Sequence, residues 1–191
     1  YHSTHKALRR GLSNPVMEAE VISEHQHEAR KQLSLHRVRP AQIEQFWSRL
    51  GNDYFLRYSG YEIAWHTQAV AEHGDKQEPL VLLRQQTERG GTEIFIYTPI
   101  RAHQFTTTTT LLDQIGLNIV DARILSSCDN YTLDTYMVLE EDGEPIRGQF
   151  RLQEIQRMLR HLLLHPEETP ERVQRQMARQ LKHFNIPVSY T

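Results

Sequence analysis

The fold is decided by three apolar stretches in the second half of the chain: TEIFIYT at residues 92–98, GLNIVDARI at 116–124 and YTLDTYMVL at 131–139. Each stretch is rich in β-branched and aromatic residues, which favour strands. A segment with helical spacing, residues 103–115, separates the first two stretches, and the turn-forming residues CDN at 128–130 separate the last two. The pattern therefore predicts a strand, a helix and a two-stranded hairpin.

The remaining elements of this half follow from its periodicity. Leucine and isoleucine recur at helical spacing from residue 152, which predicts a second helix after a turn at residues 141–144. The predicted strands cover residues 92–98, 117–127, 131–140 and 183–190, and the predicted helices cover 103–115 and 150–165. This order, β-α-β-β-α-β, is the ferredoxin-like arrangement. The predicted fold class is α+β, with two helices on one face of a four-stranded antiparallel sheet.

The first part of the chain is predicted to be a helical arm. Asn14 followed by Pro15 is a helix-start signal, and Ser59 with Glu62 forms a capping box. We expect helices over residues 1–13, 15–37, 40–50 and 59–73, an aromatic connector over 52–58 and a short strand over 79–83.

The composition excludes several classes of protein. Lys and Arg total 22 against 24 for Asp and Glu, so the overall charge does not favour nucleic acid or an anionic membrane as a partner. No stretch approaches the roughly 20 apolar residues of a spanning helix. A single cysteine, Cys128, cannot form an internal disulfide, and a reducing cytoplasm is the expected compartment. Because the chain begins at Tyr1 and ends at Thr191 within predicted elements, we expect it to be a piece of a longer protein.

Catalytic and metal-binding patterns are weak. The sequence has no phosphate-binding loop, no HExxH and no GxSxG motif, so we expect no catalytic residue in this chain. His25 with His27, and His161 with His165, have spacings that could suit a metal, but they lack nearby ligands and are interpreted as solvated helix residues. The carboxylates of Asp142 and Glu144 lie in a predicted turn, and no metal site is predicted there.

The loop between the first strand and the first helix of the predicted sheet is the best candidate for a binding site. A helix N-terminus presents unpaired N–H groups and the positive end of a dipole, which suits a carboxylate. Asn118, expected close to that loop, offers an amide that can donate and accept. Together these residues could hold the head group of an amino acid; from the residues alone, a surface loop without a ligand is the favoured alternative. The candidate ligand-binding residues are Ile100, Arg101, His103, Gln104, Phe105 and Asn118.

Several motifs resemble a known family. RGGTEIFIYTP at 89–99, LLD at 111–113 with GLNIVDARI at 116–124, and LDTY at 133–136 resemble the first ACT domain of the bifunctional PII uridylyltransferase/uridylyl-removing enzymes. The upstream segment, with FWSR at 46–49 and DYFLRYS at 53–59, is similar to the region that precedes that domain. In this family the loop usually reads Pro-Asp-Arg-Pro, whereas here it reads PIRA at 99–102.

The resemblance implies a parent enzyme with a nucleotidyltransferase domain, a hydrolase domain and two ACT domains. Such an enzyme attaches UMP to PII signalling proteins when glutamine is scarce and removes it when glutamine is plentiful, with Mg²⁺ as the expected cation. Residues 1–78 would be a helical connector after the hydrolase domain, 79–91 a short strand and linker, and 92–191 the ACT domain. No cofactor is expected in this chain itself.

Two hypotheses follow from the resemblance. In the first, the segment senses glutamine through the loop residues and Asn118, and the helices of residues 15–73 transmit its occupancy to the catalytic domains. In the second, this ACT domain pairs with another ACT domain, with a dimer through their sheets as one form, and binds no ligand itself.

Overall fold

The computed structural model describes residues 14–74, 76–85 and 89–175, and its chain divides into two compact units. The first unit comprises residues 1–75 together with 127–129, and the second comprises residues 76–126 and 130–191. The predicted helix at residues 1–13 and the predicted strand at 183–190 lie outside the described residues.

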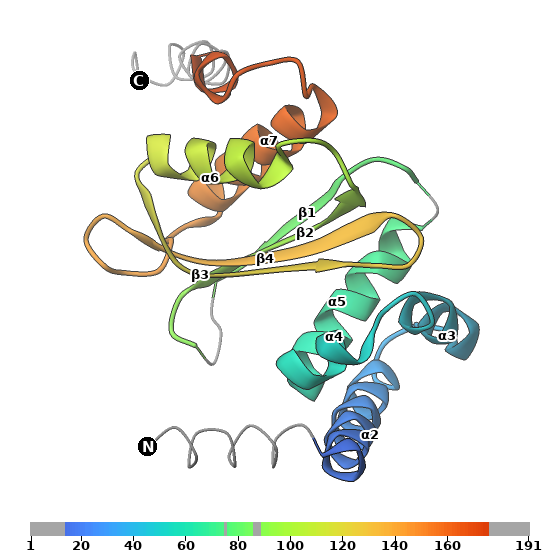
Figure 1. Cartoon of the computed structure of the whole chain (residues 1–191). Helices are drawn as coiled ribbons and strands as arrows, with labels where there is room; N and C mark the ends of the chain where they lie inside the picture. The colour runs from blue at the N-terminus through green and yellow to red at the C-terminus, as the bar shows by residue number, and fades with distance from the viewer. Residues whose placement is uncertain (1–13, 75, 86–88, 176–191) are drawn as a thin grey trace, which may run out of the picture. The chain divides into compact units, whose positions relative to one another are not determined.

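The described part of the helical arm, residues 14–74, contains four helices (Figure 1): α2 (Pro15–Leu33), α3 (Pro40–Trp47), α4 (Asn52–Arg57) and α5 (Gly60–His73). Asn14 caps α2 by accepting a hydrogen bond from the N–H of Val16, and Ser59 and Glu62 form the predicted capping box of α5. The start signals of both helices are therefore confirmed. Helix α2 ends four residues before the predicted boundary at Arg37, and residues 34–37 form turns.

The aromatic connector predicted for residues 52–58 is wrong, because most of it is helix α4. This helix turns Tyr54 and Phe55 into an aromatic cluster with Trp47 of α3. The hydroxyl of Tyr54 lies 2.9 Å from Nδ1 of the buried His66 on α5. The burial of two aromatic rings on one short turn stabilises a helix that has little intrinsic propensity to form.

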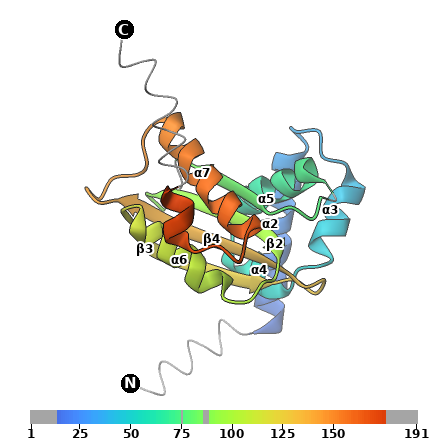
Figure 2. The same ribbon diagram turned by 90° about the horizontal axis from the view of Figure 1, so that it is seen from above.

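The second unit is an antiparallel sheet with two helices on one face (Figures 1 and 2). The strands are β1 (Leu80–Arg84), β2 (Thr92–Pro99), β3 (Leu117–Ser126) and β4 (Tyr131–Glu140), in the order β1-β2-β4-β3. The two helices on this face are α6 (Gln104–Gln114) and α7 (Gln149–Leu164). The predicted fold class is confirmed.

The position of β1 in the sheet was not foreseen. We expected residues 79–83 to form a separate short strand, but Leu80–Arg84 pairs antiparallel with β2, from Leu80 opposite Tyr97 to Arg84 opposite Glu93. Strand β2 thus has a hydrogen-bonded neighbour on each side, β1 and β4.

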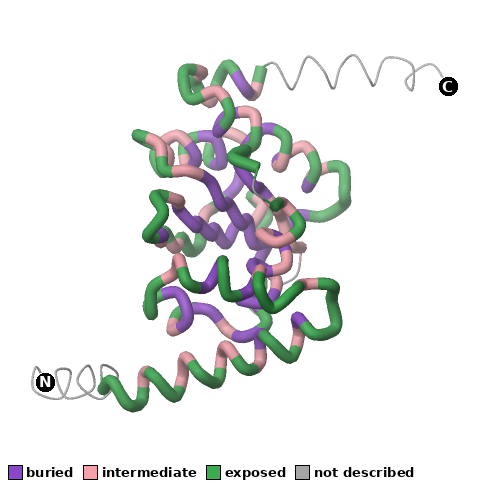
Figure 3. The backbone as a smooth tube through the Cα atoms, turned by 90° about the vertical axis from the view of Figure 1, so that its right-hand side faces the viewer, coloured by how far each residue is buried: buried purple, intermediate pink, exposed green. Residues whose placement is uncertain are grey.

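The hydrophobic core of this unit lies between the sheet and its two helices. Because side chains alternate along a strand, Ile94 and Ile96 of β2 share one face, and Tyr136 and Val138 of β4 lie on the same face. The inner sides of α6 and α7 cover them; Figure 3 marks the buried residues in purple. The helical residues of this core are Leu111, Leu112, Leu152, Ile155, Met158, Leu159, Leu162 and Leu163.

Phe105 is less buried than the other large apolar residues of α6. Its exposed fraction is 48%, while Leu112 is fully buried. The Phe105 ring lies nearly parallel to that of Tyr136, with 6.3 Å between the ring centroids. Phe105 sits in the first turn of α6, so it lies at the rim of the core and faces the loop that precedes the helix.

Candidate functional site

The loop after β2 is held in place at both ends. Pro99 ends the strand, and the N–H of Ile100 donates to the main-chain oxygen of Asn130 in the β3–β4 turn, 3.0 Å away. His103 adopts a left-handed conformation (φ 61°) at the N-cap position of α6. Among the described residues its side chain makes no capping hydrogen bond, so no N-cap side chain satisfies the first N–H groups of the helix.

A pocket of about 250 Å³ opens beside this loop. Five of the six predicted site residues line it, namely Ile100, Arg101, His103, Gln104 and Phe105. The other lining residues come from the helix and from the two strands beneath it: Thr106, Ile124, Ser126, Thr132 and Asp134. At about 30 Å³ per water molecule, the pocket has the space of roughly eight waters, which is in the size range of a small amino acid.

Asn118 is not part of this pocket, and the prediction that it lies close to the loop is wrong. Asn118 is the second residue of β3 and pairs with Leu139 near the end of β4, whereas the pocket is lined by Ile124 and Ser126 at the other end of β3. At a rise of about 3.3 Å per residue, six residues of strand separate Asn118 from Ile124 by roughly 20 Å. The error arose because the first residues of this strand were placed at the wrong end of the sheet.

Asp134 is the only ionisable side chain among the lining residues that the sequence analysis did not predict. Only 2% of it is exposed, and its carboxylate accepts hydrogen bonds from the hydroxyl of Thr132 and from Nε2 of Gln104, the latter over 3.3 Å. Burial raises the pKa of the Asp134 carboxyl from its ordinary value of 3.8 to about 6, although both hydrogen bonds act in the opposite direction. A sequence signal was available. Asp134 is two residues from Tyr136 and four from Val138, so in a strand its side chain lies on the same face as these core residues.

Other polar groups lie buried near the same end of the core. Thr98, Thr108 and Tyr136 have no exposed surface, and their hydroxyl groups have no hydrogen-bond partner among the described residues. Burial, and then the charge of Asp134, raise the pKa of the Tyr136 hydroxyl well above its ordinary value of 10.0. This end of the core is therefore polar, in contrast to the end formed by Leu111 and Val138.

Arg101 has a structural contact as well as a place in the pocket wall. Its Nη1 donates to the main-chain oxygen of Leu163, in the last turn of α7. Carbonyl groups at a helix C-terminus lack partners within the helix, so a cation there is favourable. The contact fixes the loop against α7, and it uses one of the five N–H groups of the guanidinium.

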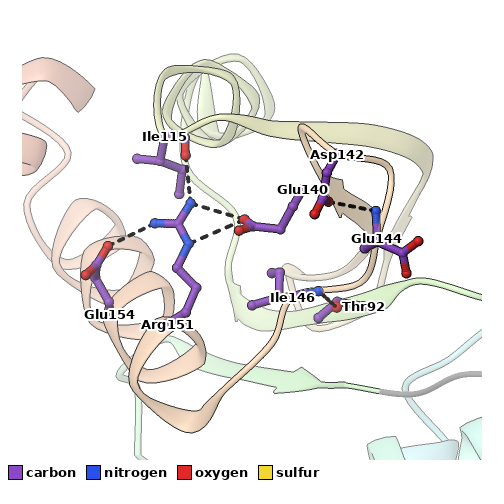
Figure 4. Close-up of polar contacts among 8 residues, drawn as sticks. All are labelled: Thr92, Ile115, Glu140, Asp142, Glu144, Ile146, Arg151 and Glu154. Atoms are coloured by element: carbon purple, nitrogen blue, oxygen red, sulfur yellow. Dashed lines mark hydrogen bonds and ion pairs between the residues drawn. The ribbon is translucent and has the colours of Figure 1, made fainter.

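A second pocket, of about 580 Å³, lies at the opposite end of α6. Its central cation is Arg151 of α7, shown in Figure 4. Arg151 donates to Glu140 over 3.2 Å, to Glu154 over 3.0 Å and to the main-chain oxygen of Ile115 over 2.8 Å. These contacts satisfy the arginine within the protein, so this pocket offers a ligand mainly the carboxylates of its rim, Glu141 and Asp142.

The histidine and carboxylate pairs considered from the sequence have other contacts. Nδ1 of His25 lies within hydrogen-bonding distance of the main-chain oxygen of Phe55, and Nε2 of His161 lies 2.9 Å from Glu168. Asp142 accepts from the N–H of Glu144 within the turn, over 3.0 Å. Across residues 14–74, 76–85 and 89–175, no group of three or more His, Cys, Asp or Glu side chains could hold a metal ion.

Comparison with known proteins identifies the chain's relatives. The family described as "Uridylyltransferase GlnD fifth domain" matches residues 17–69, which fall in helices α2 to α5. The bifunctional uridylyltransferase/uridylyl-removing enzyme of Stutzerimonas stutzeri is 45% identical over 195 residues, which cover 100% of this chain. The chain matches a segment of the bifunctional uridylyltransferase/uridylyl-removing enzymes.

Further uridylyltransferase/uridylyl-removing enzymes agree with this result. That of Pseudomonas fluorescens is 44% identical over 96% of the chain, and one from Pseudomonas putida is 43% identical over 100%. The chain spans only about a fifth of these relatives, between 21% and 22% of their length. No solved structure matches the chain. The resemblance inferred from the sequence motifs is thus confirmed, and it extends over both units.

The described helices were also compared with the requirements of a membrane span. None of them is both long enough and apolar enough to cross a bilayer.

Proposed function

We propose that this chain is the regulatory segment of a uridylyltransferase/uridylyl-removing enzyme and that its pocket beside α6 binds L-glutamine. The observation that carries the proposal is the pocket itself, which gathers five candidate residues around the N-terminus of a helix and places the buried Asp134 in its wall. The name of the relatives supports the choice of enzyme, and their greater length supports a role for this segment beside catalytic parts that lie elsewhere.

In this proposal each part of the amino acid faces pocket groups of matching charge or polarity. The α-carboxylate is bound by the first N–H groups of α6 and by Arg101, because both carry positive charge. The aliphatic part of the side chain packs against Ile100, Phe105 and Ile124, which are partly exposed around the pocket. The side-chain amide faces the hydroxyl of Ser126, which is able to donate and accept.

Calorimetry with L-glutamine tests the proposal directly. We expect saturable binding of L-glutamine and at least tenfold weaker binding of L-glutamate, whose extra charge would have to be desolvated against an apolar wall. An Arg101→Gln variant is expected to bind more weakly, while Arg147→Gln, which removes an exposed arginine from the loop before α7, serves as the matched control. The absence of any binding by the unsubstituted chain would overturn the proposal.

A second candidate function is assembly without a ligand. Within the part of the chain that the structure describes, β3 forms an edge of the sheet, and Val120 in its bulge is 57% exposed. Unpaired strand edges present N–H and C=O groups that another strand can use. A dimer in light scattering that is dissociated by Val120→Lys, together with no thermal shift from glutamine, would favour this function over sensing.

The activities of the whole enzyme complete the proposal. The parent would uridylylate and deuridylylate PII proteins in the cytoplasm, and this segment would act through the helices of residues 15–73 and a second ACT domain. The Mg²⁺ expected for the parent would act in its catalytic parts. A test is to assay both activities of the full-length enzyme with and without Arg101→Gln: we expect both rates to lose their response to glutamine.

A further inference from the structure

Asp134 is a buried carboxylate that has no counter-ion among the described residues. Its hydrogen-bond donors, Thr132 and Gln104, are both neutral. Its side chain nevertheless lines the open pocket beside α6. Burying a charge without a partner costs free energy, and a neutral asparagine of the same shape would avoid this cost.

The surroundings of Asp134 favour a cation of a particular kind. Gln104 is the first residue of α6, and its side-chain amide reaches Asp134, so the helix N-terminus and the carboxylate are about one side chain apart. One end of this short span attracts a negative group and the other a positive group. A small zwitterion meets both requirements, whereas a simple metal ion would be repelled by the helix end and by Arg101.

We propose that Asp134 binds the ammonium group of the ligand, so that the pocket selects free α-amino acids and rejects analogues that lack the amino group. The inference rests on the proposed function of this pocket and adds the group that recognises the ligand's positive end. Gln104 positions the carboxylate, and Thr132 holds its other oxygen, so Asp134 is fixed before the ligand arrives. A preorganised charge loses little entropy on binding.

The experiment compares two ligands on two proteins. The ligands are L-glutamine and its deaminated analogue, 4-carbamoylbutanoate, which keeps the carboxylate and the amide. The proteins are the unsubstituted chain and Asp134→Asn, with Asp121→Asn, an exposed carboxylate on β3, as the matched control. We expect the analogue to bind the unsubstituted chain at least tenfold more weakly than glutamine. Asp134→Asn should bring the two ligands to within about threefold of each other, and Asp121→Asn should change nothing.

The outcomes separate this inference from the proposed function. Equal binding of glutamine by Asp134→Asn and by the unsubstituted chain would overturn the role of Asp134 and leave the glutamine site standing. Failure of the unsubstituted chain to bind glutamine would overturn both. If Asp134→Asn does not fold, as judged by its melting transition, the comparison of the two ligands on the unsubstituted chain still decides: equal affinities would overturn the inference.

Discussion

Arg151 of α7 donates through Nη2 to the main-chain oxygen of Ile115, the C-cap residue of α6, over 2.8 Å. The same guanidinium bonds Glu140 at the end of β4, so one side chain joins the two helices and the sheet (Figure 4). Replacing it with methionine keeps the aliphatic stem but leaves a helix carbonyl and two carboxylates without their donor. We predict that Arg151→Met lowers the free energy of unfolding by about 2 kcal/mol, the scale of a charge-assisted hydrogen bond.

The measurement is urea unfolding followed by far-ultraviolet circular dichroism. Arg147→Met is the control, because Arg147 is 78% exposed and its ion pair with Glu144, at 3.6 Å, lies on the surface. Its effect should stay below about 0.5 kcal/mol. Equal losses in the two variants would contradict the role given to Arg151.

The buried carboxylate of Asp134 should make stability depend on pH. Its pKa is about 6 in the folded protein and near 3.8 when unfolded, so between these values the folded state binds more protons. The free energy of unfolding contributed by this group is therefore highest below pH 4 and falls as the pH rises through 6. The loss approaches about 3 kcal/mol at most, at 1.36 kcal/mol per unit of pKa difference.

Asparagine at position 134 tests this linkage, because it cannot ionise. Relative to the unsubstituted chain, Asp134→Asn should be more stable at pH 7.5 and gain little at pH 4. Urea unfolding at several pH values gives the difference directly, with Asp121→Asn as the control. A difference that does not change with pH would show that Asp134 does not carry the linkage.

Gly60 is expected to tolerate no larger side chain. A Cβ atom there would lie 2.5 Å from Cβ of Glu28 and 3.0 Å from the main-chain oxygen of His25, since the start of α5 packs closely on α2. Alanine normally favours helices over glycine, so an unhindered substitution would stabilise α5. We predict that Gly60→Ala instead destabilises the helical unit by about 1–3 kcal/mol through overpacking.

Fluorescence of Trp47 and Trp65 during urea unfolding reports on this unit, because both residues lie in its helices. Gly51→Ala is the matched control, since no described atom lies within 4 Å of its added Cβ and its φ is −86°. A neutral or stabilising effect of Gly60→Ala would contradict the close packing of α2 on α5.

The position of Asn118 gives a prediction that reverses the expectation from the sequence. Asn118→Ala should leave the affinity for glutamine within about twofold of the unsubstituted chain, because Asn118 does not line the pocket. Such a change is small, since a tenfold change in affinity corresponds to about 1.4 kcal/mol. Phe105→Ala, which removes a ring from the pocket wall, should weaken binding severalfold. Calorimetry on both variants compares them, and a larger loss for Asn118→Ala would place the ligand at the other end of the sheet.

The sequence predicted those elements whose position depends on the pattern of neighbouring residues. The alternation from Tyr131 to Glu140 located β4 to the residue, and the capping box at Ser59 located the start of α5, because both signals lie within the element that they define. Five of the six candidate residues line one pocket for the same reason: they fall within residues 100–105, around one strand end and one helix start.

The predictions that were wrong depend on contacts between residues that are far apart in the sequence. Whether residues 52–57 form a helix is decided by where Tyr54 and Phe55 are buried, and their neighbours Trp47 and His66 come from other helices. Asp134 belongs to the pocket because β4 runs beneath the first turn of α6. The sequence near Asp134 does not show which part of the helix lies over it. Asn118 was misplaced for the same reason, since its position depends on its pairing with Leu139.

The place of β1 has a consequence for how the chain can be divided. Because Leu80–Arg84 pairs with β2, the four strands that the structure describes and the two helices that cover them fall between residues 80 and 164. Every strand pairing of the described sheet thus lies within one continuous length of the chain, residues 80–140. An exchange of this length between two proteins would carry each described strand together with its hydrogen-bonded partners.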